Sequence, residues 1–199
     1  MKSAIKGGLL ALAAAALPAV ASAHPAIGEA AGFSYGFAHP ISGLDHVLAM
    51  VMVGVFAFQL GGRAIWLVPT TFVLVMALGG ALGVAGINVP FVEIGIALSV
   101  VVLGAVVALN VKAPLAAALG IIGLFAIFHG HAHGVEMPED VAGAAYAAGF
   151  MAATALLHVA GLAVGYVIGR ASERQGLFVT RTAGGLAAVA GVGILAGLI

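Results

Sequence analysis

Cysteine is absent from the 199 residues of the chain, and only 7% of the residues are charged. The absence of cysteine excludes disulfides, thiolate metal sites and cysteine nucleophiles. Soluble domains carry about 25% charged residues, so this chain lacks the polar side chains that would cover a soluble surface. Seven basic and seven acidic residues cancel to zero net charge, which also excludes the basic face of a nucleic-acid-binding protein. The 63% of hydrophobic residues instead indicates a membrane protein with several spans in the lipid bilayer.

The first 23 residues have the parts of a secretory signal: two lysines, an apolar stretch at 7–17 and an A-x-A cleavage site ending at Ala23. The apolar stretch is short for a bilayer core of about 30 Å, which favours cleavage over an uncleaved first transmembrane helix. We therefore expect residues 1–23 to be a signal peptide and residues 24–199 to form one transmembrane domain. His24 would then be the mature N-terminus, and a bacterial inner membrane would be the location.

Six apolar segments follow, each reaching the roughly 20 residues that a spanning helix needs. They run approximately over 39–60, 64–85, 90–110, 114–133, 141–169 and 178–199. With six spans, all cations of the mature chain fall on one side of the membrane: Arg63, Lys112, Arg170, Arg174 and Arg181. The positive-inside rule makes that side cytoplasmic. The sequence thus predicts an all-α bundle of six transmembrane helices with both termini in the periplasm.

Glycine is abundant, with 30 residues in the chain. Gly161, Gly165 and Gly169 recur at four-residue spacing and therefore share one face of the fifth span. Small residues let transmembrane helices approach closely, so we expect this face to pack tightly against another helix. The pattern fits contacts within one chain and contacts in a homo-oligomer equally well.

Histidine stands out in a chain that otherwise avoids polar side chains, since it occurs seven times. Ionisable residues are costly inside a membrane and mark pathways or binding sites. In the first span, His39 and His46 are seven residues apart and share a face if one helix includes both. Pro40 is typical of a first helical turn. Asp45 would either ligate an ion beside His46 or accept an N–H from a ligating imidazole and fix its tautomer.

A second cluster lies at the end of the fourth span. His129 and His133 are four residues apart, which places two imidazoles on one side of a helix. Glu136 joins that face if the helix continues, whereas His131 points elsewhere, about 200° around the helix. The intervening glycines either leave room for close approach or let the helix unwind. In the predicted topology both clusters lie at the periplasmic ends of their spans and meet at one entrance.

We expect this entrance to bind a metal ion through His39, Asp45, His46, His129, His133 and Glu136. Four further residues are candidates for which a core hydrogen bond, an interfacial charge or solvation is the ordinary alternative: His24, Glu93, His131 and His158. Imidazole and carboxylate ligands without thiolate suit Ni²⁺, Co²⁺, Zn²⁺ or Cu²⁺, and affinity order alone does not select among them. The ion would be cargo, and no resident cofactor is expected.

With both clusters in view, the chain resembles the HupE/UreJ family of nickel permeases, which are found beside hydrogenase and urease accessory genes. The family motif H-P-x-x-G-x-D-H is matched by His39, Pro40, Gly43, Asp45 and His46. The motif F-H-G-x-A-H-G-x-E is matched by Phe128, His129, Gly130, Ala132, His133, Gly134 and Glu136. The resemblance implies a secondary permease rather than an enzyme, importing Ni²⁺ with Co²⁺ as a second ion. It also implies that no ATPase subunit is needed.

Two other functions would use the same residues. An intramembrane metal-dependent hydrolase could hold a catalytic Zn²⁺ between His129, His133, Asp45 and His46. A metal sensor would need the binding site but no pathway. Both are alternatives to the permease that the two motifs favour.

Overall fold

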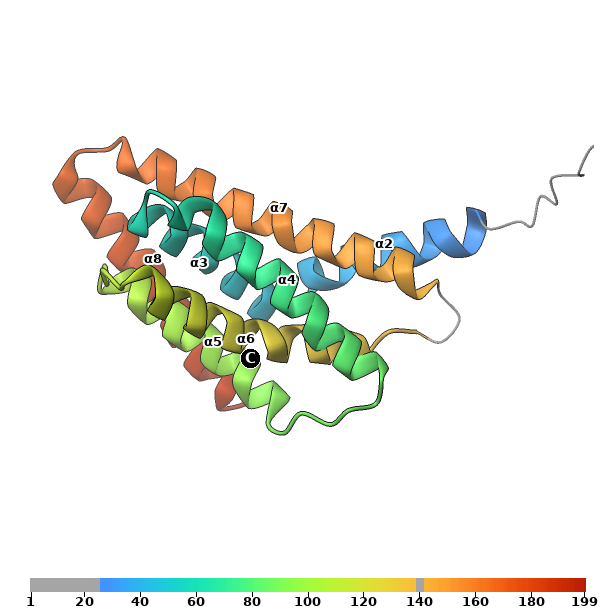
Figure 1. Cartoon of the computed structure of the whole chain (residues 1–199). Coiled ribbons are helices and arrows are strands. Elements are labelled where there is room, and N and C mark those ends of the chain that lie inside the picture. Colours follow the sequence, from blue (N-terminus) through green and yellow to red (C-terminus); the bar gives the residue numbers. More distant parts are fainter. Residues whose placement is uncertain (1–25, 139–141) are drawn as a thin grey trace, which may run out of the picture.

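Seven α-helices make up the part of the chain that the structure describes (Figure 1). The structure is a computed structural model that describes residues 26–138 and 142–199. The helices are α2 (Ala26–Ser42), α3 (Leu44–Leu60), α4 (Ala64–Val84), α5 (Val92–Ala108), α6 (Leu115–Val135), α7 (Gly143–Gly169) and α8 (Glu173–Leu195). No strand occurs within the described ranges, so the all-helical prediction is confirmed. The predicted signal peptide at 1–23 and His24 lie outside the described residues.

The apolar helices are those of a multi-pass membrane protein. Four are long and apolar enough to cross a membrane, namely α4, α6, α7 and the Arg174–Leu195 part of α8. Ala30–Ser42 and α3 together pass the same test as one span that is bent by 81°. α5 has 17 residues, about 26 Å of helix, which is slightly less than a hydrocarbon core of about 30 Å. Helix length and composition therefore support four spans, or five with the bent pair, and six spans stay a prediction.

The first predicted span is not one continuous helix, and this part of the prediction was wrong. α2 ends at Ser42 and α3 begins at Leu44, with Gly43 in an extended conformation between them (φ −92°, ψ 124°). Pro40 lies near the end of α2, whereas we expected it in the first turn of a helix. Proline removes a backbone hydrogen bond and glycine lowers helix stability, so the two together favour a break at this point.

α2 packs along the first half of α7, and residues 26–38 of α2 lie outside every predicted span. Gly36 lies against the backbone of Tyr146, and Gly149 lies against the backbone of Phe33. A Cβ at either glycine would overlap the facing carbonyl oxygen, so this close approach depends on both glycines. The contact anchors the end of α2 that carries His39.

The glycine face of α7 packs against α3, as the four-residue spacing predicted. Gly161 contacts the backbone of Val51, and Gly165 and Gly169 lie against the ring of Phe58. This face is therefore occupied within the chain, because α3 belongs to the same molecule.

Glycines also bring α4 and α6 together. Gly130 and Gly134 of α6 lie against the backbone carbonyls of Met76 and Gly80 on α4. α6 continues through both glycines to Val135. Of the two roles considered for these glycines, the structure therefore supports close approach and not unwinding. The contact holds the histidine-bearing end of α6 at a set position on the bundle.

The two ends of the bundle differ in charge. Arg63 lies between α3 and α4, Lys112 between α5 and α6, and Arg170 directly after α7. These three connections lie at one end, on the left in Figure 1. Lys112 Nζ donates to the backbone oxygen of Gln59 at 2.6 Å, which ties the α5–α6 connection to the end of α3. Both histidine clusters lie toward the other end, where the break at Gly43 and the end of α6 are found.

Candidate metal site

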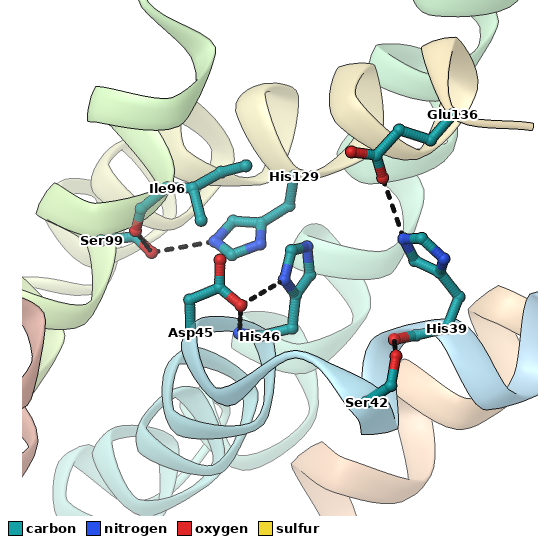
Figure 2. A network of polar contacts seen from close by, with 8 residues as sticks. All are labelled: His39, Ser42, Asp45, His46, Ile96, Ser99, His129 and Glu136. Atoms are coloured by element: carbon teal, nitrogen blue, oxygen red, sulfur yellow. Dashed lines mark hydrogen bonds and ion pairs between the residues drawn. The ribbon is translucent and has the colours of Figure 1, made fainter. Parts of the chain in front are cut away.

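Gly43 makes room for the acidic residue of the first motif. Asp45 Oδ1 accepts hydrogen bonds from the backbone nitrogen of His46 at 2.8 Å and from Nδ1 of its ring at 2.9 Å (Figure 2). A Cβ on Gly43 would lie 2.7 Å from the same Asp45 oxygen and 3.2 Å from His46 Nδ1. The φ and ψ of Gly43 are accessible to any residue. A side chain at this position would therefore force the Asp45–His46 pair to shift.

The imidazoles of both motifs form one continuous series. The ring centroids are 4.7 Å apart between His39 and His133, 4.5 Å between His133 and His46, and 4.7 Å between His46 and His129. His39 and His46 belong to different helices, so they do not share a helix face as we expected. His133 of α6 lies between them instead. The break at Gly43 thus brings residues of α2, α3 and α6 into one cluster.

Carboxylates surround the exposed end of this series. Glu136 Oε2 lies 2.9 Å from His39 Nε2, and both side chains are partly exposed. One ligand atom each of His39, His133 and Glu136 lies within 4.8 Å of the others, a spacing that could hold a metal ion. A cavity of about 260 Å³ opens here, and its polar lining includes His39, Asp45, His46, Glu93 and Glu136. Glu93, at the start of α5, therefore joins the cluster.

Several buried imidazole nitrogens have no hydrogen-bond partner in the part of the chain that the structure describes. Within the described residues, no hydrogen bond reaches Nε2 of His46, Nδ1 of His129 or either ring nitrogen of His133. Burying a polar atom without a partner is costly and rare in native proteins. These three rings lie next to one another, with carboxylates at the mouth. The arrangement is suited to a cation that takes nitrogen lone pairs.

The two remaining histidines of the described chain differ in position. His158 of α7 is 1% exposed, and both of its ring nitrogens are buried without a partner among the described residues. Phe72 separates it from the series, with ring centroids 5.6 Å from His129 and 5.1 Å from His158. His131 instead donates from Nε2 to the backbone oxygen of Ile87 at 2.9 Å. His158 therefore lies in the buried interior next to Phe72, and His131 lies apart from the cluster.

Sequence reasoning missed the neighbours that other helices contribute. Ser99 of α5 places its hydroxyl 2.8 Å from Nε2 of His129. The ring of Phe150, from α7, lies 4.1 Å from that of His133 between centroids. A lone serine in an otherwise apolar stretch of α5 was the one available signal, and nothing in the sequence linked it to His129.

Comparisons with known proteins identify the family. The profile described as HupE / UreJ protein matches residues 10–194. The chain belongs to the HupE/UreJ family. It is also 51% identical over 189 residues to Protein HupE of Rhizobium leguminosarum bv. viciae, an alignment that covers 94% of this chain and 95% of that protein. No solved structure matches the chain significantly. The HupE/UreJ resemblance that the two motifs indicated is therefore confirmed over nearly the whole chain.

Proposed function

We propose that this HupE/UreJ chain is a secondary permease that imports Ni²⁺ across the cytoplasmic membrane by facilitated diffusion, with Co²⁺ as a second ion. One observation carries the proposal: four imidazoles from three helices converge beside carboxylates at one end of an apolar bundle. Buried nitrogens without a partner among the described residues supply the lone pairs that a metal ion needs. The residues proposed to form the metal site are His39, Asp45, His46, His129, His133 and Glu136.

The chemistry of these donors narrows the cargo to borderline divalent ions. Imidazole suits Ni²⁺, Co²⁺, Zn²⁺ and Cu²⁺, whereas hard ions such as Mg²⁺ prefer oxygen ligands. The resemblance to nickel permeases is the reason for choosing Ni²⁺ among them. Zn²⁺ is the competitor that the uptake experiment must include. The site requires no resident cofactor for this task.

The order of the residues suggests a route for the ion. Glu136 and Glu93, at the mouth, would attract the hydrated cation. The ion would then exchange water for imidazoles in the order His133, His46 and His129, which follows the ring series inward. His158 would serve as an inner station beyond Phe72. His24 would add a ligand at the mature N-terminus, whereas the contact of His131 with the Ile87 carbonyl argues against a ligand role for His131.

Asp45 has two conceivable roles, and its contacts favour one. Its Oδ1 receives hydrogen bonds from both the backbone and the ring of His46. This leaves Nε2 of His46 as the free nitrogen, since Nδ1 carries the proton that Asp45 accepts. We therefore propose that Asp45 orients His46 and adds negative charge to the site.

The membrane potential is sufficient to drive entry. An inside-negative potential contributes about 2.3 kcal/mol per elementary charge per 100 mV, so a divalent ion gains about twice that. Binding at each station must stay moderate, because an ion held too tightly would not leave. No ATPase subunit is then required.

Location and topology complete the proposal. Residues 1–23 would be removed as a signal peptide, and residues 24–199 would form one six-helix domain in a bacterial inner membrane. Both termini would be periplasmic, with the histidine cluster at the periplasmic face. The cations in three connections at the opposite end support this orientation. The lipid bilayer and a divalent metal ion are the partners that this function needs, and a homo-oligomer is compatible with it.

Ion flux into liposomes tests the function. The mature protein is reconstituted with a metal-sensitive dye inside and an inside-negative diffusion potential. We expect Ni²⁺ entry with wild-type protein, and at least tenfold slower entry with His46→Ala and with His129→Ala. His131→Gln is the matched control, because it lies on the same helix end and keeps a donor for the Ile87 carbonyl. Co²⁺ and Zn²⁺ are added as competitors to rank selectivity.

The same preparation separates the alternatives. HupE/UreJ membership supports a transport role over the zinc hydrolase, which would use His129, His133, Asp45 and His46 as its ligands. Cleavage of a lipid amide without ion flux would support the hydrolase and contradict the permease. Ni²⁺ binding with no flux in wild-type liposomes would support a sensor.

A further inference from the structure

Ser99 is a buried hydroxyl in an apolar helix, and it contacts a proposed ligand. Apart from Glu93 in the first turn, it is the one polar side chain of α5. Ser99 and His129 are both 0% exposed. Ser99 Oγ lies 2.8 Å from Nε2 of His129 and 2.6 Å from the backbone oxygen of Ile96 (Figure 2). The hydroxyl therefore has two partners and no access to solvent.

The two contacts determine where the protons lie. A serine hydroxyl has one hydrogen to donate, and a carbonyl oxygen can only accept. The hydrogen therefore goes to Ile96, at the shorter distance, and the Ser99 oxygen accepts from Nε2 of His129. A neutral imidazole carries one N–H, so Nδ1 of His129 holds a lone pair. That Nδ1 is buried and has no hydrogen-bond partner among the described residues.

His46 presents the opposite nitrogen. Asp45 accepts the proton on Nδ1 of His46, which leaves Nε2 free. In Figure 2 the ring of His129 directs one nitrogen toward Ser99 and the other toward the side on which His46 lies. The ring centroids are 4.7 Å apart at an interplanar angle of 89°. The two nitrogens without a partner among the described residues thus belong to neighbouring rings, one from α3 and one from α6.

We propose that Ser99 is a positioning residue that holds His129 in its Nε2–H tautomer, so that His129 binds the transported metal through Nδ1 while His46 binds it through Nε2. This inference rests on the proposed function for the identity of the ligand, but the tautomer itself exists without metal. Outer partners of this kind orient the ring and raise the basicity of the ligating nitrogen. Their loss typically reduces metal affinity by about 10- to 100-fold.

Three substitutions separate positioning from structural support. Ser99→Ala removes the acceptor while leaving a good helix former in α5. Ser99→Thr restores a hydroxyl at the same place. Thr180→Val is the matched control, because Thr180 is a buried hydroxyl of α8 that donates to the backbone oxygen of Gly176 at 2.8 Å and touches no histidine. Circular dichroism and gel filtration check that each full-length variant is folded.

Nitrogen NMR of apo protein with ¹⁵N-labelled histidine rings reads the tautomer directly. The His129 signals are assigned by their disappearance in His129→Gln. We expect a protonated Nε2 and an unprotonated Nδ1 in wild type, retained in Thr180→Val and lost or mixed in Ser99→Ala. A wild-type His129 protonated on Nδ1 would overturn the proposal, whatever the transport assay shows.

Metal binding supplies the second readout. Ni²⁺ affinity in detergent should fall about 10- to 100-fold in Ser99→Ala and recover in Ser99→Thr. Cu²⁺ serves as an EPR probe, because pulsed EPR detects the remote imidazole nitrogen, whose signal should change between wild type and Ser99→Ala. Unchanged Ni²⁺ affinity in folded Ser99→Ala would overturn the proposal. Ser99-dependent binding without flux in liposomes would contradict transport and still support the assignment of His129.

Discussion

Substitution of Gly43 by alanine tests whether the space that glycine leaves beside Asp45 is needed for metal binding. The added Cβ would lie 2.7 Å from Asp45 Oδ1, about 0.7 Å inside the 3.4 Å at which ordinary contact begins. The carboxylate would have to move by about that amount, which would disturb its 2.9 Å hydrogen bond with His46 Nδ1. Hydrogen bonds to a charged group contribute about 1.5–3 kcal/mol. Since about 1.4 kcal/mol is tenfold in affinity, we expect Ni²⁺ to bind about 10- to 100-fold more weakly.

Titration calorimetry of the purified protein with Ni²⁺ measures this effect. Gly120→Ala is the control, because a Cβ there would meet no described atom within 4 Å. Asp45→Asn should weaken binding to a similar degree. Adding Gly43→Ala to Asp45→Asn should cost less than Gly43→Ala costs alone, because the amide oxygen of asparagine makes a weaker hydrogen bond to His46 than the carboxylate does. Wild-type affinity in Gly43→Ala, or losses that simply add in the double variant, would refute the steric reasoning.

Gly130→Val should lower the thermal unfolding midpoint in detergent, because the valine side chain would overlap the Met76 carbonyl. Overpacking of this kind costs about 1–3 kcal/mol of stability. A midpoint equal to that of Gly120→Ala would contradict the close packing of Gly130 against Met76. Glu136→Gln should raise the half-saturating Ni²⁺ concentration by less than about fivefold, since its pair with His39 is partly exposed and such pairs contribute about 0.2–1 kcal/mol. Uptake kinetics measure this, and an effect of tenfold or more would contradict a peripheral role for Glu136 at the mouth of the site. Acidification from pH 7.5 to 5.5 should weaken Ni²⁺ binding to the wild-type protein, because protons compete with the metal for imidazole nitrogens. Calorimetry at both pH values measures this, and tighter binding at pH 5.5 would argue against imidazole ligation.

The composition of the cluster could be predicted because it depends on local spacing. His129 and His133 are adjacent on any helix that includes both, and Asp45 lies next to His46 in the chain. The charge pattern predicted where the two motifs lie along the bundle, since it placed both of them at the end opposite the cations. The structure brings these residues together at that end.

The bend at Gly43 and the partners from other helices could not be predicted in this way. The position of His39 depends on the packing of α2 against α7 through Gly36 and Gly149, and single-sequence periodicity does not encode which helices pair. Ser99 reaches His129 only because α5 and α6 pack in one particular register. A helical pattern therefore predicts which residues share a face, but it does not predict what that face meets.

The helix ends at the site explain why acids and histidines occupy the positions they do. α3 and α5 begin at the cavity, and each has an acid in its first turn, Asp45 and Glu93. These carboxylates offset the partial positive charge of the helix N-termini, which would otherwise repel a cation. α2 and α6 end at the same place, with His39 and His133 in their last turns. The negative C-terminal ends of those helices add to the attraction for a cation. Of the four helices that meet the cavity, α2 and α6 therefore attract a metal ion through their C-terminal ends, and α3 and α5 each carry an acid that offsets the positive charge of their N-terminal ends.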